Sequence, residues 1–95
     1  MRKQDILQEL EDASRKLGYK VRYEKGSFVG GDCRVHEDNI LVVNKFIPIE
    51  GKIATIARAL VRIGVEGIFL SPQARKAVDE EISKTRPETP ESFEY

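Results

Sequence analysis

The amino-acid sequence predicts a small α+β domain, and three observations support this prediction. The first is an apolar stretch, residues 40–43, followed by a long helical pattern over residues 48–63. The second is the alternation of apolar and basic residues over positions 19–23, typical of a strand with one solvent-facing side. The third is helical spacing of apolar residues near both ends of the chain. We therefore expect an N-terminal helix, a small, mainly antiparallel sheet of about three strands, a central buried helix and a C-terminal helix.

The chain has 95 residues, which is enough for one domain. We assign residues 1–84 to this domain and interpret residues 85–95 as a disordered tail, because they contain two prolines and four charged side chains without apolar periodicity. A domain this small buries only about 60–65% of its unfolded surface, so association would add stability. We therefore expect a protein partner or a homodimer.

An apolar stripe predicts the first helix over residues 5–17, with one buried face. Asp5 is the expected N-cap, because its carboxylate can accept a hydrogen bond from an unpaired backbone N–H. Gly18 is expected to end the helix in the left-handed conformation. The residues of the stripe are Ile6, Leu7, Leu10, Ala13 and Leu17.

A glycine-rich connection, residues 26–31, leads into a predicted hairpin whose arms are residues 32–35 and 40–44. The connection lacks the G-x-x-x-x-G-K-[ST] pattern of a phosphate-binding loop, so we interpret Gly30 and Gly31 as a bulge or tight bend. Residues 36–39 are polar and form the expected turn. The second arm is apolar at every position from 40 to 43, which is typical of a strand at the centre of a sheet.

The central helix is expected to run from Pro48 to about Ile63, with Gly64 as its stop. Its buried face is predicted to consist of Ile53, Ile56, Ala57 and Leu60, widened by Val61 and Ile63. Residues 65–70 are expected to form an edge strand or an extended cover to the core. Ser71 and Pro72 then predict the start of a last helix that ends near residue 84.

Arg58 and Arg62 lie one turn apart on the central helix and are expected opposite its buried face. Such a pair has two physical uses. Each guanidinium can contact carboxylates of the protein, where it contributes about 1 kcal/mol at most. Alternatively, the two can form a fork for a phosphate or carboxylate ligand, a geometry that arginine suits well. Arg58 and Arg62 are the candidate anion or partner contacts of the sequence.

Charge and cysteine content narrow the classes of function. The 16 basic and 16 acidic residues give a formal net charge of zero, so a concentrated basic face for nucleic acid is not expected. Cys33 is the single cysteine, which leaves no intramolecular disulfide. The first residues lead directly into a helical pattern without the apolar core of a signal peptide, and no apolar run reaches the length of a membrane span. A cytoplasmic protein without membrane association is the expectation.

Catalytic and metal-binding sets are not recognisable in the sequence. Cys33 and His36, three positions apart on a predicted strand, point to opposite faces, and a structural zinc site needs four such ligands. The acidic pairs at positions 11–12, 37–38 and 80–81 are interpreted as solvated, whereas a catalytic pair needs environments that separate its two pKa values. We therefore expect no metal, no cofactor and no enzymatic activity.

The order of the predicted elements resembles the front half of small zinc peptidases, in particular the bacterial peptidases that cleave repressors of mobile elements. The resemblance rests on residues 17–21, on Val42-Val43-Asn44, and on Thr55, Ile56, Ala57 and Leu60 of the helix that carries T-L-A-H-E-L-G-H in that family. Arg58 and Arg62 occupy the two metal-binding histidine positions, and Ala59 occupies that of the general-base glutamate. Guanidiniums do not ligate a cation, so the resemblance implies the framework without its zinc chemistry. The segment 30–34 (GGDCR) also resembles short bacterial proteins that contain G-G-x-C-R, which implies no function.

The leading hypothesis is a non-catalytic interaction or regulatory protein that acts as a homodimer or with a protein partner. The alternative is an anion-binding or nucleic-acid-binding module that uses Arg58 and Arg62. An enzyme is the third hypothesis.

Overall fold

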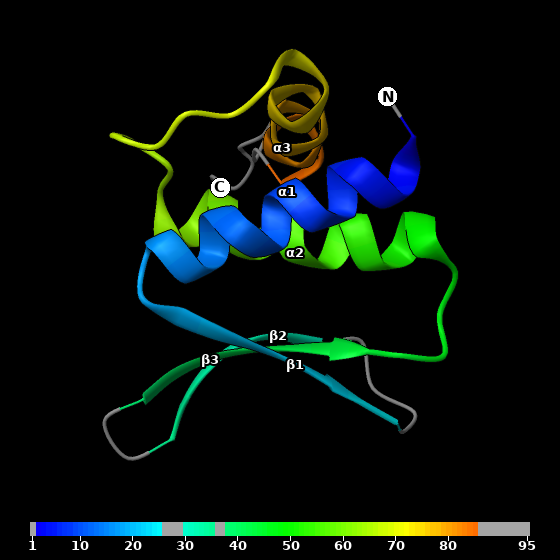
Figure 1. The fold of residues 1–95 in the computed structure, drawn as a ribbon, viewed down its shortest axis with the longest axis vertical. Coiled ribbons are helices and arrows are strands. Elements are labelled where there is room, and N and C mark those ends of the chain that lie inside the picture. The colour runs from blue at the N-terminus through cyan, green and yellow to red at the C-terminus, as the bar shows by residue number, and fades with distance from the viewer. Residues whose placement is uncertain (1, 26–29, 36–37, 86–95) are drawn as a thin grey trace, which may run out of the picture.

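Two helices cover one face of a three-stranded sheet, and a third helix lies across them on the side away from the sheet (Figure 1). This arrangement comes from a computed structural model, which describes the backbone of residues 2–25, 30–35 and 38–85 and the side chains of residues 2–25 and 39–84. The elements are α1 (Lys3–Lys16), β1 (Tyr19–Glu24), β2 (Gly30–Val35), β3 (Asp38–Asn44), α2 (Ile49–Ile63) and α3 (Pro72–Thr85). The α+β class is confirmed.

The sheet has the strand order β1-β3-β2, so the last strand in sequence lies between the first two. β2 runs antiparallel to β3, with Cys33 opposite Ile40 in the register, but β1 runs parallel to β3, with Val21 opposite Leu41. The expectation of a mainly antiparallel sheet is therefore wrong for one of the two strand pairs. The physical reason is that the alternating pattern of β1 is the same beside a parallel or an antiparallel neighbour, so the sequence pattern does not encode the direction of this pair.

The core extends from the helix-facing side of the sheet through the facing sides of α1 and α2 to Ala74 and Val78 of α3. Leu41 and Val43 of β3 are fully buried there, against Ile56 and Leu60 of α2 and Leu10 of α1. α2 has the predicted buried face at Ile56, Ala57 and Leu60, while Ile53 is only partly buried because it faces a groove described below.

The helix ends follow local backbone chemistry. α1 begins at Lys3, two residues before the predicted N-cap, and Asp5 instead accepts a hydrogen bond from the backbone N–H of Arg2 at 3.3 Å from within the first turn. Gly18, which follows the C-cap Leu17 of α1, and Gly64, which directly follows α2, adopt φ angles of +91° and +95°, as expected for the residues that end these helices.

Residues 65–70 form no strand, so the prediction of an edge strand is wrong; the segment contains a turn at residues 66–67, closed by a hydrogen bond from the N–H of Ile68 to the carbonyl of Val65 at 3.2 Å. Leu70 is 5% exposed and belongs to the core, whereas Phe69 is 81% exposed. Ser71 Oγ accepts the N–H of Ala74 at 3.4 Å, so Ser71 caps α3 as predicted. α3 extends to Thr85, one residue into the segment interpreted as a tail. The remainder of that segment, residues 86–95, and His36 in the predicted turn lie outside the described residues.

Candidate functional site

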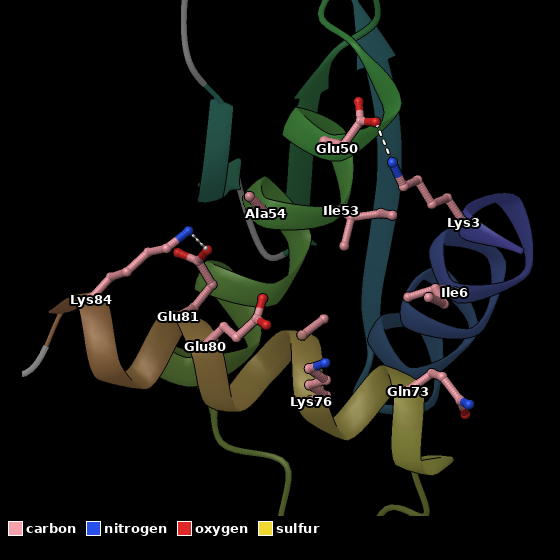
Figure 2. A pocket seen from close by; sticks show the side chains of 11 residues that line it. Lys3, Ile6, Glu50, Ile53, Ala54, Gln73, Lys76, Glu80, Glu81 and Lys84 are labelled. Carbon is pink, nitrogen blue, oxygen red and sulfur yellow. Dashed lines mark hydrogen bonds and ion pairs between the residues drawn. The ribbon is translucent and has the colours of Figure 1, made fainter. Parts of the chain in front are cut away.

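A groove with a volume of about 460 Å³ is lined by residues of all three helices. Figure 2 shows two ion pairs at opposite ends of this groove, Lys3 with Glu50 and Lys84 with Glu81, and the side chains of Ile53 and Ala54 between them. The apolar lining consists of Ile6, Ile53, Ala54 and Ala77, and the polar lining is completed by Gln73, Lys76 and Glu80.

Small side chains keep the groove open. Ala54 of α2 and Ala77 of α3 both line it, where a longer apolar residue would fill the space between the helices. Ile53 is the larger neighbour, and it stays partly exposed although it packs against the core. The groove therefore combines an accessible apolar strip with charged groups of both signs.

The ion pair at the first end joins α1 to α2. Lys3 Nζ lies 2.6 Å from Glu50 Oε2, and both side chains are well exposed. The hydrogen bond from Lys3 lowers the pKa of the Glu50 carboxyl, with a smaller contribution from the charge of Lys3. Glu50 therefore stays ionised to a lower pH than an ordinary glutamate.

The ion pair at the second end contains a buried carboxylate. Glu81 is only 3% exposed, and its two oxygens meet different cations: Arg58 Nε lies 3.3 Å from Oε1, and Lys84 Nζ lies 3.2 Å from Oε2. The interpretation of positions 80–81 as a solvated pair is correct for the exposed Glu80 and wrong for Glu81. The burial of Glu81 could have been predicted from helical spacing. Glu81 follows Ala74 by seven residues and Val78 by three, so it continues the buried stripe of α3.

The two arginines singled out by the sequence differ in their surroundings. Arg58 is 41% exposed and points to α3, where its guanidinium meets Glu81. Arg62 is exposed and lies in the last turn of α2. Neither arginine lines the groove, although Arg58 contacts a residue that does. Sequence reasoning missed the groove residues Ala54, Ala77 and Glu81 as a group, because they come from separate helices.

Two further carboxylates of α1 are hydrogen-bonded within the fold. Glu9 accepts the backbone N–H of Ser71 at 2.6 Å and its hydroxyl at 2.7 Å, which ties α1 to the start of α3. Glu11 accepts the hydroxyl of Tyr23 on β1. Burial raises the pKa of Tyr23 above its ordinary range, and the hydrogen bond to Glu11 raises it further.

Among residues 2–25 and 39–84, whose side chains the structure describes, no group of three or more His, Cys, Asp or Glu residues is placed to hold a metal ion. The side chain of Cys33 lies outside the described side chains, as His36 does. No helix of this same part of the chain has the length and apolar character needed to cross a membrane.

Comparison with known proteins gives no match. No protein-family model fits the chain, and neither a curated protein nor a solved structure is significantly similar to it. The resemblance to repressor-cleaving zinc peptidases therefore stays a prediction from the residues alone.

Proposed function

We propose that this protein is a non-catalytic interaction module whose groove binds one amphipathic helix of a protein partner. The observation that supports this most is the strip of Ile53, Ala54 and Ala77, which remains accessible with an ion pair at each end of the groove. An apolar strip flanked by charges matches the apolar face and charged margins of an amphipathic helix.

The small residues favour a helix over a bulkier occupant. Two packed helices lie about 8–10 Å apart, and the distance is shortest where their contact residues are small. Ala54 and Ala77 provide such contacts on two different helices, so an added helix would lie between α2 and α3. The lysines and glutamates around them would then pair with the charged margins of the partner.

The state of the groove carboxylates supports a non-catalytic role. Glu50 and Glu81, which lie at opposite ends, each have a cation within 3.3 Å. A general acid needs a raised pKa, yet Lys3 lowers the pKa of Glu50. These groups serve better as fixed charges than as proton donors.

The contact between Arg58 and Glu81 favours the first of the two uses predicted for the arginine pair, which is contact with carboxylates of the protein itself. The Arg58 Nε atom lies 3.3 Å from the Glu81 carboxylate. We therefore assign partner binding to the groove, and Arg58 acts by holding the groove residue Glu81 in place.

A peptide selection tests the proposal. Short peptides from a random phage-displayed library are selected on the wild-type protein, and their Kd is measured on the wild type, on Ala77→Arg and on Asp79→Arg. Ala77 lines the groove, whereas Asp79 is exposed on the same helix outside it, so Asp79→Arg is the matched control.

We expect amphipathic helical peptides whose affinity falls at least about tenfold, or ~1.4 kcal/mol, with Ala77→Arg and little with Asp79→Arg. Peptides that bind both variants equally, or no enriched peptides, would overturn the proposal, and circular dichroism checks that both variants fold.

A further inference from the structure

β1 lies at an edge of the sheet, paired with β3 on one side only. We propose that this edge is the interface of a symmetric homodimer, in which β1 of one copy pairs antiparallel with β1 of a second copy. The two sheets would then join into one continuous sheet. This interface uses no residue of the groove, so it stands independently of the function proposed above.

The direction of the backbone groups shows which residues would form the new hydrogen bonds. Lys45 N–H donates to the carbonyl of Glu24 at 3.0 Å, which continues the ladder between β1 and β3. Glu24 therefore directs its backbone groups to β3, and since the direction alternates along a strand, Arg22 does the same. Val21 and Tyr23 direct their N–H and C=O groups to the open edge.

The side chains of β1 are less covered than those of its neighbour. Tyr19, Val21 and Tyr23 pack against the core from the helix-facing side, yet all three are only partly buried. Leu41 and Val43 of β3, on the same side of the sheet, are fully buried. A strand added beside β1 would cover the apolar side chains that the edge leaves accessible.

One antiparallel register satisfies both the backbone and the charges. When the two-fold axis passes beside Arg22, Val21 lies opposite Tyr23 of the second copy, and these residues exchange both of their hydrogen bonds. Lys20 then lies opposite Glu24 of the second copy on the other side of the sheet, where the side chains of such a pair are close. By symmetry each attractive pair occurs twice.

Neighbouring registers are less favourable. An axis beside Val21 places Lys20 opposite Arg22, which sets like charges together. An axis beside Tyr23 leaves only residues 22–24 paired within β1, whose bounds are Tyr19–Glu24. In the favoured register the two Arg22 side chains meet once at the axis, where Glu24 Oε2 of the same strand lies 2.9 Å from Arg22 Nη2, and the two Lys20–Glu24 pairs offset this single like-charge contact.

An interface of one strand pair is small, so we expect a concentration-dependent equilibrium between monomer and dimer rather than a permanent dimer. Sedimentation equilibrium on the full chain measures it directly. Lys20→Glu places two glutamates opposite each other and should weaken the dimer at least about tenfold. Lys16→Glu makes the same charge change at an exposed position outside β1 and is the matched control.

A disulfide test fixes the register. Arg22→Cys in a Cys33→Ser background places two cysteines opposite each other, with Cα atoms about 4.5 Å apart in a non-hydrogen-bonded pair, which a disulfide spans. Lys20→Cys in the same background is the control, because its two cysteines would lie four residues apart along the strands, or ~13 Å. We expect a covalent dimer of the Arg22→Cys variant under mild oxidation and almost none of the control. A wild-type chain that is monomeric at all concentrations, or equal cross-linking of both variants, would overturn the inference.

Discussion

Arg58 on α2 and Glu81 on α3 form an ion pair with one buried end: Arg58 Nε lies 3.3 Å from Glu81 Oε1, and the side chains are 41% and 4% exposed. The carboxylate has given up nearly all of its contact with water, whereas the guanidinium retains much of its own. Loss of the arginine would therefore remove a compensating charge from a buried anion, but loss of the glutamate would leave a cation that water can still solvate.

This asymmetry predicts unequal effects of mutation. Arg58→Ala should lower the free energy of unfolding by about 1–3 kcal/mol, more than expected for an exposed ion pair, because Glu81 keeps its burial with less compensation. In a Glu81→Leu background, which replaces the carboxylate with an apolar side chain, the same arginine change should cost little. Urea denaturation of the wild type, both single variants and the double variant measures the difference.

The control for this cycle is Arg75→Ala, an exposed arginine on α3. It should change the stability by about 0.5 kcal/mol or less in either background. An equal cost of Arg58→Ala with and without Glu81 would show that the arginine acts through packing of its aliphatic part instead.

The second prediction concerns the core. Leu60 is completely buried, so Leu60→Ala should lower the stability by roughly 2–5 kcal/mol through lost apolar contact and the cavity left behind. A domain of this size has a total of only about 5–15 kcal/mol. Val61→Ala, at the partly exposed neighbouring position, should cost clearly less. Similar melting temperatures of the two variants would contradict the assigned burial.

The third prediction concerns the contact between Glu9 and Ser71. Glu9→Ala should lower the stability by about 1–3 kcal/mol, since its carboxylate accepts two hydrogen bonds from Ser71 at 2.6 and 2.7 Å. Ser71→Ala removes the hydroxyl that is shared by this contact and by the α3 cap. The two effects should therefore be less than additive in the double variant. Strict additivity in thermal melts would show that the residues act separately.

The fourth prediction is a pH dependence from Tyr23. Its pKa is raised mainly by burial and then by the hydrogen bond to Glu11, so the folded protein retains a phenolic proton that the unfolded chain loses near pH ~10. The stability that Tyr23 contributes is complete below that pH and decreases as the pH rises toward the raised pKa. Ultraviolet titration of tyrosinate, with Tyr23→Phe to assign the signal, measures this pKa.

Glu11→Gln gives the matching test of cause. It removes the negative charge beside the hydroxyl but keeps an acceptor, so it should lower the pKa of Tyr23 without bringing it to the ordinary value, because burial remains. An unchanged titration in Glu11→Gln would leave burial as the sole cause.

Regular patterns in the sequence predicted most of the local structure. The spacing of Ile56, Ala57 and Leu60 gave the buried face of α2 correctly, and the apolar run in β3 indicated its central place. Direction was not encoded in the same way. Nothing in the alternation of β1 distinguishes a parallel from an antiparallel neighbour, because both put successive side chains on opposite faces.

The groove was harder to foresee because its parts have ordinary explanations when taken separately. Alanine is common in helices, so Ala54 and Ala77 attract no attention in the sequence. Only when α2 packs against α3 do their short side chains line one groove together. Glu81 could have been recognised from its position on the buried stripe of α3. Its partner Arg58, 23 residues earlier, could be found only once the two helices were placed together.

Because β3 lies between two strands that precede it in the sequence, the sheet can form only after β3 has been synthesised. β1 and β2 leave the ribosome first, but each pairs with β3 alone, so neither has a partner in the sheet while β3 is still inside. At about 5–20 residues per second, the interval between the end of β1 at Glu24 and the end of β3 at Asn44 lasts roughly one to four seconds. Throughout that interval the apolar side of α1 also lacks Leu60, which covers it later, and Leu41 appears only near its end. The nascent chain therefore exposes unpaired strand edges and the apolar side of α1 until the middle of the sequence has been synthesised. We expect chaperone binding during this interval to have the greatest effect on yield.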